Sequence, residues 1–138
     1  MMKFKFLPAL LVLVLAVGCD GNVQLKGKVV FSDDKSPVPV GTVCFQTDTF
    51  LARGNLKPDG TFVVGSLKQG DGLPPGTYHV FITDANKTLG YDVYGQAIME
   101  PLIDTKYDHA SSSGLTLEVD RSTRYIEFEV DRAPPSRR

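Results

Sequence analysis

Two short stretches decide the fold class, and they read Asp59-Gly60-Thr61-Phe62-Val63-Val64 and Leu73-Pro74-Pro75-Gly76-Thr77-Tyr78-His79-Val80. In each stretch, a tight turn built from Pro, Gly or Asp leads directly into a segment with alternating apolar residues. In the second stretch, this alternation places Tyr78, Val80 and Ile82 on one face of the chain. A tight turn followed by a period of two residues predicts strands that cover a core with one face.

The same pattern recurs along most of the chain. Alternating apolar residues predict five further strands, at residues 23–32, 40–47, 50–56, 115–119 and 126–130. We expect residues 120–123 to join the last two strands as a β-hairpin. A chain of 138 residues is long enough for one domain with a core. The sequence therefore predicts an all-β fold, a seven-stranded antiparallel Greek-key β-sandwich over residues 23–131, with residues 132–138 as a disordered tail.

The N-terminus has the pattern of an export signal. Lys3 and Lys5 precede an apolar run at residues 7–17, which is shorter than the ~20 residues that a membrane span needs. A positive flank and a short apolar run are typical of a signal peptide, which we place at residues 1–18 and expect to be helical. The junction Leu15-Ala16-Val17-Gly18-Cys19 resembles the bacterial lipoprotein signal.

This resemblance implies that lipid is attached to Cys19 and that residues 19–22 form the lipidated N-terminus and a short tether. Several acyl chains, such as palmitate, hold a small domain at a membrane, because each buried CH₂ contributes ~0.8 kcal/mol. We therefore expect a membrane-anchored lipoprotein of the cell envelope that faces the periplasm or the exterior. The alternatives are an ordinary signal peptide or an uncleaved anchor, in which Cys19 has no role.

Several segments of the domain carry a family resemblance. They are Gly27-Lys28-Val29, Pro37-Val38-Pro39-Val40-Gly41-Thr42-Val43-Cys44-Phe45 and the two stretches quoted above. Their order resembles the carboxypeptidase regulatory-like, transthyretin-like (prealbumin-like) sandwich. Residues 101–107 and 112–119 look like the closing segment of small bacterial lipoproteins with this domain. The resemblance covers roughly residues 23–130 and implies an accessory, interaction or stability module without catalytic residues of its own.

The charge balance and the cysteines argue against several functions. Fifteen basic and 16 acidic residues give a formal net charge of -1, which becomes -3 once Lys3 and Lys5 are removed with the signal peptide. A mildly acidic domain binds phosphate backbones poorly, so we expect no nucleic-acid partner. If Cys19 is acylated, Cys44 has no partner for an internal disulfide. We expect Cys44 to be a buried, unreactive thiol.

The histidines and acidic residues do not form a recognised catalytic or metal-binding pattern. His79 and His109 are too far apart in sequence to match the iron ligands of intradiol dioxygenases, which have a related sandwich. Residues 133–138 lack the Tyr-Arg-Gly-Ser-type tail of the transthyretin-like hydroxyisourate hydrolases. Asp residues recur at turns, where their side chains bond the backbone, and not at the spacing of a calcium loop. We expect no enzyme activity, no metal and no cofactor.

Residues 85–114 are the exception to the short spacing of the strands, because a structureless loop of that length is uncommon in a compact domain. The segment is rich in apolar residues, namely Tyr91, Val93, Tyr94, Ile98, Met99, Leu102, Ile103 and Tyr107. We therefore expect residues 97–103 to pack as a short edge strand or flap. Tyr91, Tyr94 and Tyr107 are candidates for a surface that contacts a protein or a glycan. The alternative is that these tyrosines cap the end of the core.

Together these patterns predict a non-catalytic, lipid-anchored envelope module for protein interaction or envelope support. The alternative is a solute- or carbohydrate-binding lipoprotein that uses residues 85–114. In either case the membrane is one partner, through the lipid on Cys19.

Overall fold

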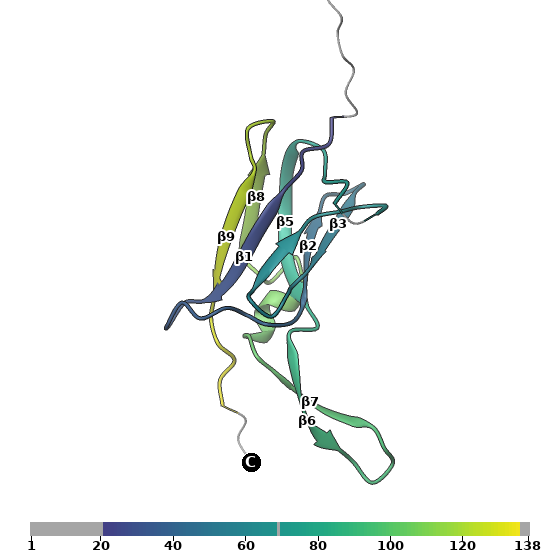
Figure 1. Ribbon diagram of the computed structural model, residues 1–138, viewed down its shortest axis with the longest axis vertical. Helices are drawn as coiled ribbons and strands as arrows, with labels where there is room; N and C mark the ends of the chain where they lie inside the picture. Colours follow the sequence, from purple (N-terminus) through teal and green to yellow (C-terminus); the bar gives the residue numbers. More distant parts are fainter. Residues whose placement is uncertain (1–20, 69, 136–138) are drawn as a thin grey trace, which may run out of the picture.

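The computed structural model describes residues 21–68 and 70–135, and these residues form an all-β structure (Figure 1). Two sheets pack face to face. One has three strands in the order β4-β1-β9, and the other has four strands in the order β3-β2-β5-β8. The all-β prediction is confirmed. The predicted signal-peptide helix at residues 1–18 lies outside the described residues, as do Cys19 and residues 136–138.

The strands of the three-stranded sheet are β1 (Lys26–Phe31), β4 (Thr61–Val63) and β9 (Tyr125–Val130). Those of the four-stranded sheet are β2 (Thr42–Gln46), β3 (Leu51–Asn55), β5 (Gly76–Thr83) and β8 (Leu115–Val119). Between β5 and β8 the chain forms a separate pair of strands, β6 (Asn86–Tyr91) and β7 (Ala97–Pro101), and then the 3-10 helix η1 (Thr105–Asp108). No helix in the described part of the chain is long and apolar enough to cross a membrane.

Alternation along the strands turns one face of each sheet toward a shared core. Phe45 of β2 packs against two aromatic rings of the opposite sheet. The ring centres of Phe62 and Phe128 lie 6.0 Å and 6.3 Å from that of Phe45, and all three side chains are buried. Tyr78 of β5 is also buried, and its hydroxyl donates to the carbonyl of Pro74 at 2.5 Å. The two stretches that decide the fold class thus supply core residues to both sheets.

The predicted turn at residues 57–60 is confirmed. The backbone N–H of Gly60 donates to the carbonyl of Lys57 at 2.8 Å, and Asp59 Oδ1 accepts from the hydroxyl and the backbone N–H of Thr61. These two hydrogen bonds hold the pKa of Asp59 below its ordinary value, and the bond from the Thr61 hydroxyl has the larger effect. Gly60 has a φ of 80°, and a Cβ there would lie 2.7 Å from the carbonyl oxygen of Val29. Position 60 therefore requires glycine.

β1 and β9 run parallel, whereas the sequence pattern predicts only antiparallel neighbours. Lys26 lies opposite Tyr125, and Phe31 lies opposite Val130. The other pairings between the described strands are antiparallel. The prediction of a wholly antiparallel sandwich is therefore wrong at this one pairing. Strand alternation does not reveal it, because parallel and antiparallel neighbours both leave alternate side chains on the core face.

The connection between β8 and β9 is not the predicted hairpin. These two strands belong to different sheets, so residues 120–123 carry the chain from one sheet to the other. The turn itself is present, because the Asp120 carboxylate accepts from the backbone N–H groups of Ser122 and Thr123. Such a turn reverses the chain, but it does not decide which sheet the next strand joins.

The predicted strand within residues 97–103 exists as β7, but it is not an edge strand of the sandwich. β7 pairs with β6, and neither strand is part of the two larger sheets. The two strands can pair outside the sandwich because β6 begins next to the point where β7 ends. The backbone N–H of Leu102, after β7, donates to the carbonyl of Ala85, before β6, at 2.8 Å.

The ordered domain extends beyond residue 131, where the disordered tail was predicted to begin. The backbone of Arg132 pairs with that of Ile103, and its guanidinium carbon lies 3.8 Å from the ring centre of Phe31. The same guanidinium contacts the carboxylates of Asp33 and Asp34 at 3.0 and 3.4 Å. Arg132 therefore closes this end of the domain and is not part of a free tail.

Candidate functional site

The β6–β7 hairpin projects from one end of the sandwich, which we call the hairpin pole (Figure 1). An isolated two-stranded hairpin is only marginally stable in water, so its order must come from its base and its turn. At the base, Ile103 is buried, and Leu102 accepts a backbone hydrogen bond from Ala133 at 3.0 Å. The base of the hairpin is thus attached to the domain by a buried side chain and by backbone hydrogen bonds.

The tip of the hairpin is a tightly bonded turn at residues 92–96. Asp92 Oδ1 accepts from the backbone N–H groups of Tyr94 and Gln96 at 2.8 and 3.0 Å. The backbone of Asp92 exchanges a further bond with Gln96, and Gly95 donates to the Asp92 carbonyl with a φ of 78°. These bonds define the positions of the two residues between Asp92 and Gly95. Val93 and Tyr94 are 92% and 88% exposed.

The arms of the hairpin add further exposed apolar side chains. Leu89 and Tyr91 belong to β6, and Ile98 and Met99 belong to β7. Residues directly opposite each other share a face, and the register pairs Met99 with Thr88 and Ile98 with Gly90. Both faces of the hairpin therefore carry apolar surface. Several exposed apolar side chains gathered on one projecting element make the hairpin a candidate interaction site.

The structure brings together two of the three predicted tyrosines. Tyr91 and Tyr94 lie on the hairpin and are exposed. Tyr107, in η1, is only 5% exposed and belongs to the hydrophobic core, and its hydroxyl accepts from the backbone N–H of Asp131 at 3.0 Å. Tyr107 is therefore not part of an exposed surface. It caps the core, as the alternative interpretation of the tyrosines expected for all three.

Four apolar residues complete the hairpin surface, and sequence reasoning did not assign them to it. They are Leu89, Val93, Ile98 and Met99. The signal was present, because the apolar content of residues 85–114 exceeds that of an ordinary loop. This content predicts packing against the sandwich, which the structure confirms for Leu102, Ile103 and Tyr107 but not for the residues of the hairpin, which are exposed.

Replacing Asp92 by alanine is expected to loosen the tip without unfolding the domain. The change removes the acceptor for the backbone N–H groups of Tyr94 and Gln96, and hydrogen bonds to a charged group contribute ~1.5–3 kcal/mol each. Amide hydrogen exchange at these two residues should accelerate by about tenfold or more. Asp92→Asn keeps the Oδ1 acceptor and is the matched control. Equal exchange in Asp92→Ala and the wild type would show that the carboxylate does not order the tip.

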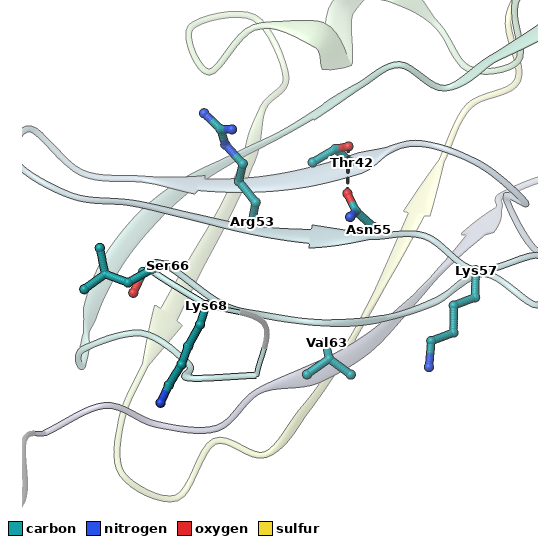
Figure 2. Close-up of a pocket in the computed structure, with 9 residues that line it drawn as sticks. Thr42, Arg53, Asn55, Lys57, Val63, Ser66 and Lys68 are labelled. Atoms are coloured by element: carbon teal, nitrogen blue, oxygen red, sulfur yellow. Dashed lines mark hydrogen bonds between the residues drawn. The ribbon is translucent and has the colours of Figure 1, made fainter.

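A second surface feature is a groove of about 360 Å³ beside β3 (Figure 2). Three cations line it, Arg53, Lys57 and Lys68, together with polar and apolar residues that include Leu67, and no acidic side chain. Figure 2 shows Lys57 and Lys68 extending to one side and Arg53 to the other. Because the three charged groups diverge, the groove does not enclose a single anion.

The remaining titratable groups do not gather into a reactive site. In residues 21–68 and 70–135, no three His, Cys, Asp or Glu side chains come close enough to hold a metal ion. His79 and His109 line separate depressions, of about 490 and 280 Å³. Cys44 is buried, as predicted, and burial raises the pKa of its thiol. A raised pKa makes a thiol a weaker nucleophile at neutral pH.

No family model matches the chain, and no curated protein matches it. Among solved structures, a 9R-lipoxygenase from Cyanothece PCC8801 is similar over 80% of this chain, at 13% identity and a TM-score of 0.39. This chain spans 17% of the length of that lipoxygenase. Such a likeness supports no argument about activity. The function of this chain is therefore inferred from its own surface, in which the β6–β7 hairpin is the dominant feature.

Proposed function

We propose that the protein is a non-catalytic, lipid-anchored module of the cell envelope that binds a partner protein through the β6–β7 hairpin. One observation carries the proposal. The turn ordered by Asp92 holds Val93 and Tyr94 out in solvent, at the end of an arm that packs on neither sheet. Apolar and aromatic side chains held in a fixed geometry bind with little loss of conformational entropy.

The position of the N-terminus supports a protein partner in preference to the membrane. The described chain begins at the end of the sandwich opposite the hairpin, which we call the N-terminal pole (Figure 1). Val23 is fixed there by two backbone hydrogen bonds with Leu73, at 2.7 and 3.1 Å. Val23 is only four positions after Cys19 in the sequence, a separation of at most ~14 Å when the chain is extended. A lipid on Cys19 would therefore hold the N-terminal pole at the membrane and direct the hairpin away from it.

The proposal includes the finer fold, a seven-stranded Greek-key sandwich of the prealbumin-like, carboxypeptidase regulatory-like type. One of the two larger sheets has three strands and the other has four, which makes seven. The chain crosses from one sheet to the other after β1, β3, β4 and β8. Crossing connections of this kind are typical of Greek-key sandwiches. The β6–β7 hairpin is then an insertion between two strands of one sheet, β5 and β8, that pair directly.

Lipidation of Cys19 is tested in the native envelope with the full chain. Globomycin, which blocks the lipoprotein signal peptidase, is expected to leave a precursor that keeps residues 1–18, and Cys19→Ser should also prevent acyl labelling. Cys44→Ser is the matched control, because Cys44 is buried and its loss should leave processing unchanged. Normal processing in the presence of globomycin would remove the anchor from the proposal.

The partner is identified by photo-crosslinking from position 94 of the full chain in living cells. A benzophenone side chain at this exposed tip should yield an adduct of one defined mass. The same group at Tyr125 of β9, which is exposed but outside the hairpin, should not yield that adduct. An adduct with a glycan would instead favour the alternative function, a carbohydrate-binding lipoprotein. The absence of any adduct with a macromolecule would favour a solute-binding lipoprotein. A glycan that binds the native chain would also raise its melting temperature.

A further inference from the structure

Leu67 is the most exposed large apolar side chain in the described part of the protein. It is 97% exposed and lies between Ser66 and Lys68 in the connection from β4 to β5. Lys68 is exposed too, and its ammonium group forms no ion pair with the described acidic residues. Leu67 thus offers exposed apolar surface next to the positive charge of Lys68, a combination that suits the boundary of an anionic membrane.

The backbone around Leu67 is held in place by one carboxylate. Asp71 accepts from the backbone N–H of Ser66 at 2.5 Å, of Leu67 at 3.0 Å and of Lys68 at 3.3 Å, and from the hydroxyl of Ser66 at 3.2 Å. These hydrogen bonds hold the pKa of Asp71 below its ordinary value, and the bond from the Ser66 backbone N–H has the largest effect. Leu67 and Lys68 are therefore displayed outward by an ordered turn.

This turn lies directly beside the point where the described chain begins. The Asn22 side chain donates to the carbonyl of Asp71 at 3.2 Å, and a Cβ on Gly72 would lie 2.1 Å from the carbonyl oxygen of Val23. Asn22 is three residues from Cys19 in the sequence, a reach of at most ~11 Å. A lipid on Cys19 would thus bring the Leu67 turn close to the bilayer surface.

Other cations lie at the same pole. The connection from β8 to β9 carries the exposed side chains of Arg121 and Arg124, and the Arg124 carbonyl accepts from the backbone of Lys26 at the start of β1. The connection also contains one carboxylate, that of Asp120. This carboxylate accepts hydrogen bonds from the hydroxyl and backbone N–H groups of Ser122 and Thr123. Cations near a membrane are attracted by anionic lipid headgroups.

From these observations we propose that the turn at residues 66–68 is a second membrane contact. Leu67 enters the boundary between headgroups and acyl chains, and Lys68 lies among the lipid phosphates. The contact rests on the proposed lipidation of Cys19, because a single leucine and lysine do not hold a domain at a membrane alone. Together, the lipid and the turn are two points of attachment, and they fix the tilt of the sandwich so that the hairpin points away from the bilayer.

The test uses the full lipidated chain, purified from the envelope and reconstituted into vesicles of phosphatidylethanolamine and phosphatidylglycerol. Leu67→Cys is labelled with an environment-sensitive fluorophore; lipid blocks Cys19, and burial protects Cys44. We expect the emission to shift to shorter wavelength and to be quenched by a spin label on the lipid headgroups. The same fluorophore on Val93→Cys, at the hairpin tip, should keep the emission of a probe in water and escape quenching. In the labelled Leu67→Cys protein, Lys68→Glu should reduce the quenching.

The outcomes separate this inference from the proposed function. A probe at position 67 that stays in water, on protein that floats with the vesicles, would overturn the membrane contact and leave the anchor intact. Protein that does not float with the vesicles would overturn both. Equal quenching at positions 67 and 93 would overturn the upright orientation, because the two poles could not then lie at different distances from the bilayer.

Discussion

Replacing Val93 and Tyr94 together by serine is expected to weaken partner binding at least ~100-fold and to leave the domain folded. Both side chains are almost fully exposed, so the change removes no core contact. Apolar and aromatic anchors at the centre of an interface contribute ~2 kcal/mol or more each, and ~1.4 kcal/mol corresponds to a factor of ten in affinity. The measurement is the dissociation constant for the crosslinked partner once purified, with the melting temperature recorded for each variant.

Tyr125→Ser is the matched control for this prediction. Tyr125 is an exposed tyrosine on β9, in the sandwich and outside the hairpin, so its loss should change neither affinity nor melting temperature appreciably. Retention of full affinity by the Val93→Ser, Tyr94→Ser double variant would mean that the partner does not use the tip. Loss of affinity in Tyr125→Ser, with full affinity in the double variant, would place the interface on the β9 side of the sandwich.

Phe45→Ala is expected to destabilise the domain by about 3–5 kcal/mol, the range for truncation of a buried phenylalanine. Phe45 is fully buried and packs against Phe62 and Phe128 of the other sheet, so its loss leaves a cavity between the two sheets. Small domains have a free energy of unfolding of ~5–15 kcal/mol. The change should therefore lower the urea midpoint strongly at a nearly constant m-value.

Tyr91→Ala is the control for the core substitution. It removes an aromatic side chain of similar size from the hairpin, where the ring is 72% exposed, and should change the free energy of unfolding by less than about 0.5 kcal/mol. A loss of less than ~1 kcal/mol in Phe45→Ala would show that the two sheets do not pack through this aromatic cluster.

Local chemistry made much of the fold predictable. The turn at residues 57–60 follows from Asp59 and Gly60, whose side-chain acceptor and positive φ are properties of those residues. The alternation of Tyr78, Val80 and Ile82 likewise predicts the buried face of β5, and the structure buries all three. These features depend on a few neighbouring residues, and those residues can be read from the sequence.

The choice of sheet for each strand was not predictable in this way. β9 joins β1, about 100 residues earlier in the chain, and does so in parallel. The Asp120 turn looks the same whether the following strand pairs with β8 or crosses to the opposite sheet. Which neighbour a strand takes depends on the packing of both sheets around Phe45, and no local pattern reports it.

The candidate site shows the same division. The apolar excess in residues 85–114 singles out the segment that contains the exposed hairpin, but residue type did not separate the exposed Tyr94 from the buried Tyr107. The β6–β7 register shifts between Thr88 and Gly90, so the alternation in the hairpin is broken and its strands are hard to recognise. The hairpin is exposed because β6 and β7 pair with each other and not with the larger sheets. This pairing depends on the hydrogen bond between Leu102 and Ala85 at the base of the hairpin.

The strand order has a mechanical consequence for a protein held at both ends. The N-terminus continues into β1, and the hairpin continues from β5, and each of these strands lies between two neighbours in its sheet. Tension between a membrane and a bound partner would therefore load interior strands, not edge strands. The hydrogen bonds beside an interior strand lie across the direction of pull and share the load, so they must be sheared together instead of peeled one at a time. A protein held at both poles would therefore resist extension through hydrogen bonds that are sheared together.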